Sequence, residues 1–205
     1  MAESKNNSRN EKRLPWAGSL DFTRVANFAL FGAAGFGVGG LILGLASEAA
    51  GRVNWKTADF LESLPLLLFP LFMLIAGAIG GIALGLALQR RISCTLAVLM
   101  ALGFFPGITI IIIASTRFSE QFNYIPNTVY IGLVLGILLG LSTKNWRKIL
   151  LLSIAGALGG VAGGAVAALS NSHAWYIIAI QGAIGGAFLG GALGILETDE
   201  GKDTS

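Results

Sequence analysis

The sequence predicts an all-α, multi-pass integral membrane protein in which six transmembrane helices form a glycine-rich, closely packed bundle of three hairpins. Six long apolar stretches carry no Asp, Glu, Lys, Arg or His side chain. Charged residues make up 12% of the chain, about half of the roughly 25% typical of soluble domains. Of the 29 glycines, all but Gly18, Gly51 and Gly201 lie in these stretches. Together these observations predict a bilayer environment and close contact between helices.

Length justifies each predicted span in turn, because a membrane-crossing helix needs about 20 apolar residues. The second span is long enough to tilt, and the fourth is short and can begin nearer Tyr124. The first is too long for the apolar core of a signal peptide, which has roughly 7–15 residues. The six spans are Val25–Ala46, Leu64–Leu88, Ile92–Ser115, Pro126–Ser142, Ile149–Ser170 and Trp175–Leu196.

Basic residues predict the orientation, since Lys and Arg concentrate in cytoplasmic segments. One side of the predicted bundle holds most of them: Lys5, Arg9, Lys12, Arg13, Arg24, Arg90, Arg91, Lys144, Arg147, Lys148 and Lys202. The other side holds only Arg52, Lys56 and Arg117. This asymmetry places both termini in the cytoplasm. It also supports the number of spans, because one helix more or fewer would destroy the alternation.

The spans divide the chain into three parts. Residues 1–24 are predicted to be a disordered, basic cytoplasmic tail, and residues 197–205 a short, loose acidic tail. Residues 25–196 form the transmembrane domain. Of the outer loops, only Ser47–Ser63 is long enough for structure of its own, and it can hold a short interfacial helix with its apolar side formed by Trp55, Phe60 and Leu61.

Glycines recur every four residues within several spans, which places them on one face of each helix. Such a face lets backbones approach closely, in the style of a glycine zipper, and this contact replaces the hydrophobic drive that lipid lacks. The predicted helix-packing residues are Gly77, Gly81, Gly85, Gly132, Gly136, Gly140, Gly156, Gly160, Gly164, Gly182, Gly186, Gly190 and Gly194.

Parts of the glycine pattern repeat, so that the first hairpin resembles the last. Residues 77–81 recur as residues 182–186, and Gly85 is answered by Gly190. The outgoing helices match at Gly32, Gly35, Gly39 and Gly40 against Gly156, Gly159, Gly163 and Gly164. A duplicated hairpin with parallel repeats explains this pattern, and chance matching between glycine-rich helices is the alternative.

The residue types that carry most chemistry are missing from the spans. Ionisable groups within the membrane mark proton relays, ion pathways and sites for charged solutes. The chain has one cysteine, Cys94, and one histidine, His173, so it offers no internal disulfide and no metal site built from these residues. No phosphate loop, nucleophile elbow or zinc-protease motif occurs. We therefore expect no enzyme activity and no cofactor.

Two polar or irregular features remain inside the spans. Gln181 is the one side-chain amide well inside a span, where it can bond a neighbouring helix or, with Trp175 and Tyr176 near the same span end, contact a substrate. Pro106 and Gly107 lie midway along the third span, where proline removes a backbone hydrogen bond and kinks the helix. The kink is explained by packing or by a transporter site.

Two functions fit this sequence. The first is a non-enzymatic membrane subunit or scaffold that assembles through glycine-lined helix faces, within one chain or between chains. Its partners would be the lipid bilayer and either further copies or other membrane subunits, with no nucleic acid. The alternative is transport, by a small permease, channel or substrate-binding membrane subunit for an uncharged or weakly polar solute.

Overall fold

The computed structural model describes residues 21–51, 60–88, 95–103, 120–170 and 175–200, and these residues are helical apart from short turns and helix ends. Within these ranges there is no β-strand. A short helical segment covers residues 95–103. The longer helices are α1 (Phe22–Gly51), α2 (Phe60–Ala87), α4 (Glu120–Leu141), α5 (Trp146–Ser170) and α6 (Trp175–Glu200).

Four of these helices are long and apolar enough to cross a membrane. The qualifying stretches are Phe22–Ala49, Pro70–Ala87, Trp146–Ser170 and Trp175–Glu197. In α4 a shorter apolar stretch, Ile125–Leu141, follows a more polar first turn. These lengths agree with the bilayer requirement of about 20 residues per span.

Several helices extend beyond the spans predicted from the sequence. Helix α1 begins at Phe22, so the end of the predicted 1–24 tail belongs to a helix. Phe60 and Leu61 open α2 and are not part of a separate interfacial helix. The predicted 197–205 tail is likewise helical through Glu200. Hydropathy locates the apolar part of a helix, whereas backbone hydrogen bonding continues into the polar flanks.

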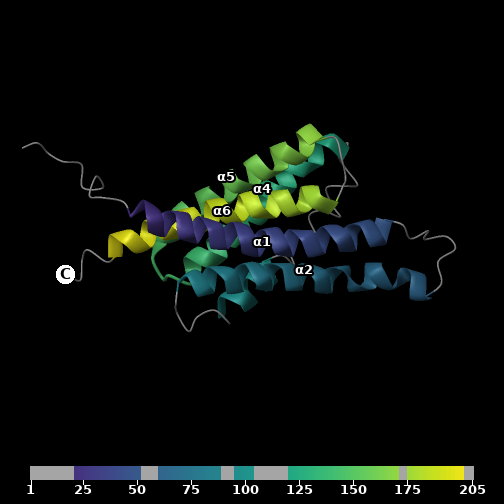
Figure 1. Cartoon of the computed structure of the whole chain (residues 1–205), viewed down its shortest axis with the longest axis horizontal. Coiled ribbons are helices and arrows are strands. Elements are labelled where there is room, and N and C mark those ends of the chain that lie inside the picture. The colour runs from purple at the N-terminus through teal and green to yellow at the C-terminus, as the bar shows by residue number, and fades with distance from the viewer. Residues whose placement is uncertain (1–20, 52–59, 89–94, 104–119, 171–174, 201–205) are drawn as a thin grey trace, which may run out of the picture.

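Most helices pack against their neighbours in sequence, and the first described helix also packs against the last. Helix α1 lies between α2 and α6, and α5 packs on both α6 and α4 (Figure 1). The segment 95–103 joins the two sides, because Gly81 of α2 faces its Leu96, while its Gly103 faces Leu138 of α4. With α6 returning to α1, these contacts form a closed cycle.

Large apolar side chains from all parts of this cycle meet in one cluster. Its members are Phe28, Phe36, Leu84, Leu96, Met100, Leu135, Leu139, Leu152, Leu189, Leu193 and Leu196. In α1 and α5 they lie in the first half of the helix, and in α2, α4 and α6 in the second half. The cluster therefore fills the bundle at the end where α1 begins and α6 ends.

A tight turn joins α4 to α5 at this same end. Lys144 adopts a left-handed backbone with φ of 54°. Asn145 Oδ1 accepts a hydrogen bond of 3.0 Å from the Arg147 backbone N–H, which caps α5. The short turn makes α4 and α5 antiparallel neighbours.

Candidate functional site

The α1–α6 interface joins the first and last described helices along matching four-residue steps. A methyl group placed on Gly186 would overlap the carbonyl oxygen of Gly32, and one on Gly32 would overlap that of Gly186. The same close approach recurs along both helices, in the pairs Phe28–Gly190, Phe36–Gly182, Gly40–Ile178 and Gly44–Trp175. The helices therefore run antiparallel with their backbones in direct contact.

The α4–α5 interface is built in the same way. Gly132 and Gly156 face each other reciprocally, each leaving no room for a methyl group beside the other's carbonyl oxygen. Along the same faces the contacts continue in the pairs Thr128–Gly160, Gly136–Leu152 and Gly140–Ile149. Backbone contact of this kind gains dispersion and Cα–H···O bonding, which are the main sources of helix attraction in lipid.

Thr128 adds a side-chain hydrogen bond to the α4–α5 interface. Its Oγ1 donates to the Gly160 carbonyl of α5 at 2.7 Å and lies 3.0 Å from the Ile125 carbonyl of its own helix. Thr128 was not among the packing residues predicted from the sequence. A threonine three to four residues ahead of a glycine series is the signal that could have identified it.

The other predicted packing glycines also lie inside the bundle. Gly81 faces Leu96 and Ala97, and Gly194 lies where a methyl group would come within 2.9 Å of Val25 Cα. Gly77, Gly85 and Gly164 are also buried. In contrast, a methyl group on Gly185 would meet no atom within 4 Å, and one on Gly191 only the Ala29 methyl at 3.9 Å.

The residues predicted as a polar contact or substrate site lie on α6, away from the Leu-rich end. Trp175 and Tyr176 form an edge-to-face pair with ring centroids 5.8 Å apart, and both are partly exposed. Gln181 packs its backbone against Gly163 of α5. Its Nε2 is buried and has no hydrogen-bond partner among the described residues. Pro106 and Gly107, the predicted kink, lie outside the described residues.

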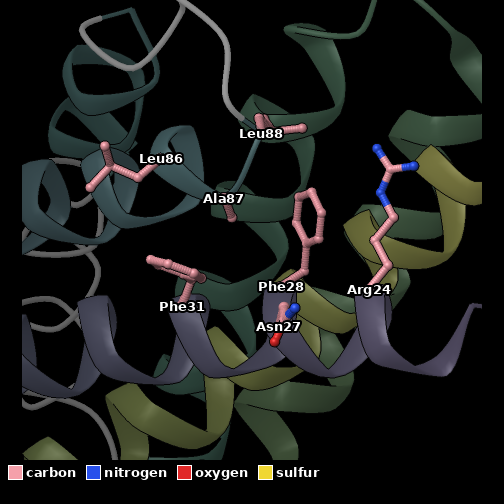
Figure 2. Close-up of a pocket in the computed structure, with 7 residues that line it drawn as sticks. All are labelled: Arg24, Asn27, Phe28, Phe31, Leu86, Ala87 and Leu88. Atoms are coloured by element: carbon pink, nitrogen blue, oxygen red, sulfur yellow. The ribbon is translucent and has the colours of Figure 1, made fainter.

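A pocket of about 360 Å³ opens between the start of α1 and the end of α2 (Figure 2). Phe28 points from α1 toward Ala87 and Leu88, and Phe31 points toward the side where Leu86 lies. Arg24 and Asn27 supply the polar lining. The pocket was not predicted from the sequence, because its two walls are far apart in the chain.

Charged side chains surround the same end of the bundle. Arg24 Nη2 lies 4.0 Å from Glu197 Oε2, joining the first turn of α1 to the last turns of α6. Glu197 is 8% exposed and Lys148 of α5 is 7% exposed, although both were expected in solvated segments. Glu197 is thus a buried part of the bundle and not part of a loose tail.

The described residues contain no cluster of three or more His, Cys, Asp or Glu side chains that could hold a metal ion. Comparison of the chain with protein-family models, curated proteins and solved structures gives no match.

Replacing Gly186 with alanine tests the α1–α6 interface. The new methyl group collides with the Gly32 carbonyl, and forced overpacking of this kind costs about 1–3 kcal/mol. Gly185→Ala is the matched control, since its methyl group enters open space and removes a helical glycine. We expect the control to be neutral or stabilising by up to about 1 kcal/mol. Reversible unfolding in mixed micelles measures both, and equal stabilities would contradict the interface.

Replacing Thr128 with valine removes the hydroxyl that bonds the Gly160 carbonyl across α4 and α5. Membrane hydrogen bonds between helices average about 0.6 kcal/mol, with a maximum near 1.7, so unfolding free energy should fall by this amount. Ser153→Ala is the control, because Ser153 Oγ donates within its own helix to the Ile149 carbonyl. A loss in the control as large as in Thr128→Val would show that the bond between helices adds nothing.

Proposed function

We propose that this chain is a non-enzymatic, six-span membrane subunit or scaffold whose glycine-lined helix faces hold three hairpins in a closed bundle. The observation that carries the proposal is the reciprocal contact of Gly32 and Gly186. It joins the first long helix to the last, so the bundle is closed by its own chain.

The packing of the glycine faces within the chain limits which surfaces a partner would bind. The glycine series of α4 and α6 are occupied by α5 and α1 of the same chain. Outward-facing side chains such as Leu158 and Val161 of α5 or Leu45 of α1 remain exposed. Contacts with lipid, further copies or other subunits would therefore use these larger apolar side chains, and not the glycine series.

The arrangement of the helix ends suits a scaffold. Arg24 and Glu197 place the start of α1 beside the end of α6. Basic residues favour a cytoplasmic location for both. These two helix ends would then present one basic and one acidic attachment point on the same membrane face.

Extraction from the native membrane in mild detergent tests this function. We expect the protein to migrate as a homo-oligomer or with a co-purifying membrane protein, measured by size-exclusion chromatography with mass spectrometry. Gly186→Leu should lower the stability of the chain itself, whereas Val161→Trp on the outer face should disturb assembly only. A monodisperse monomer without a co-purifying protein would contradict the scaffold function.

A second function, transport of an uncharged or weakly polar solute, is favoured by Gln181. A buried amide without a partner is costly in an apolar environment, and it is explained if a solute oxygen supplies the missing acceptor. Gly185, on the same side of α6, borders open space.

Gln181→Leu separates transport from packing. Because the Nε2 atom has no described partner to lose, we expect unfolding stability to be unchanged or higher, while uptake of a responsive solute into vesicles is abolished. A panel of small amides and polyols supplies the solutes, and Trp175→Phe is the control for the nearby span end. Full uptake by Gln181→Leu would exclude this residue as the transport site.

A further inference from the structure

We propose that the pocket between α1 and α2 binds one anionic phospholipid, with its phosphate at Arg24 and Asn27 and an acyl chain along Phe28, Phe31 and Leu86. This inference rests on the proposed membrane insertion and adds a specific ligand to it. It is carried by the chemistry of the pocket lining and by the position of the pocket along the helices.

The polar lining residues precede the apolar ones along α1. Arg24 and Asn27 lie in the first turns of the helix, whereas Phe28 and Phe31 extend the lining deeper into the apolar stretch. Arg24 and Phe31 are two turns apart, about 10 Å at 1.5 Å per residue. This matches the step from the headgroup layer to the hydrocarbon of a bilayer, where the polar layer is roughly 5–8 Å thick on each side.

The opposite wall, at the end of α2, is apolar. The apolar stretch of α2 ends at Ala87, and Leu86, Ala87 and Leu88 line the pocket. Leu86 is 60% exposed and Phe31 is 45% exposed, so the groove continues onto the outer surface. The cavity of about 360 Å³ can take a phosphate and the first carbons of a chain, and the remaining carbons would follow this surface.

Charge selects the headgroup. Arg24 is the one charged residue in the lining, and its side chain is 45% exposed. Glu197 lies 4.0 Å from one guanidinium nitrogen, which orients the side chain toward α6 (Figure 2) and leaves other N–H donors of the fork for a phosphate. Asn27 adds an amide donor at the same level. A lipid with net negative charge is therefore favoured over a zwitterionic one.

Bound lipid on the purified protein tests this assignment. The full chain is placed in nanodiscs with equal phosphatidylglycerol and phosphatidylcholine, extracted in mild detergent, and weighed intact by mass spectrometry. We expect wild type to retain phosphatidylglycerol in preference to phosphatidylcholine. Arg24→Gln should lower this preference about fivefold, the effect of one basic residue near an anionic surface. Arg24→Lys, which keeps the charge, should retain most of it.

Two further variants separate pocket binding from folding and general charge. Leu86→Trp fills the groove while Arg24 and its ion pair remain, and it should also reduce retention. Arg147→Gln removes an exposed arginine that lies 6.0 Å from the Trp146 ring and outside the pocket, and it should leave retention unchanged. Loss in Arg147→Gln equal to that in Arg24→Gln, or full retention in Leu86→Trp, would overturn the proposal.

Two further experiments test displacement of the lipid by free phosphate and insertion of the chain into the membrane. Inorganic phosphate at millimolar concentration should not displace the lipid, and displacement would show a simple anion site in place of a lipid site. Alkaline carbonate extraction of the same cells reports membrane insertion. A chain released by carbonate contradicts the proposed membrane function, whereas an inserted chain without lipid preference contradicts the lipid site alone.

Discussion

The constraint on which this bundle depends is that lipid gives helices no hydrophobic reason to associate. Attraction must come from backbone contact, dispersion and occasional hydrogen bonds. The reciprocal contacts of Gly32 with Gly186 and of Gly132 with Gly156 supply this attraction. The usual cost of glycine in a helix, about 1 kcal/mol in water, weakens in lipid because an unpaired backbone amide there costs several kcal/mol. Glycine thus allows close approach without melting the helix.

The two halves of the bundle use this packing differently. At the end where α1 begins, the Leu-rich cluster fills the space between helices, and its rim carries Arg24, Lys148 and Glu197. Toward the start of α6, the Gln181 backbone lies beside Gly163, and the buried Gln181 Nε2 has no described partner. The large buried side chains and the charged groups thus lie at the first end, and the Gln181 nitrogen without a described partner lies toward the second.

The sequence predicted the four long apolar helices, but it did not predict that α6 packs on α1. Apolar length locates a helix because bilayer thickness sets it, and four-residue spacing shows which face of α6 is flat. Neither says that α6 packs on α1, which depends on the cyclic order of the bundle. The matching stripe on α1 was missed because Phe36 interrupts it, although the backbone of Phe36, and not its ring, contacts Gly182. The pocket and the burial of Glu197 likewise depend on contacts between distant parts of the chain.

The contact between α1 and α6 imposes an order on the assembly of the bundle. The α1 face that carries Gly32 and Gly40 finds its partner on α6, which is synthesised after the other described helices. Helices α4 and α5, joined by the tight turn at Lys144 and Asn145, can pair as soon as α5 is complete. Local pairs form before distant ones because loop closure costs less for short connections. The α1 stripe must therefore wait, exposed to lipid or to another chain, until α6 arrives. Before α6 is synthesised, this face of α1 would be open to other helices. Once α6 packs against it, the face is covered.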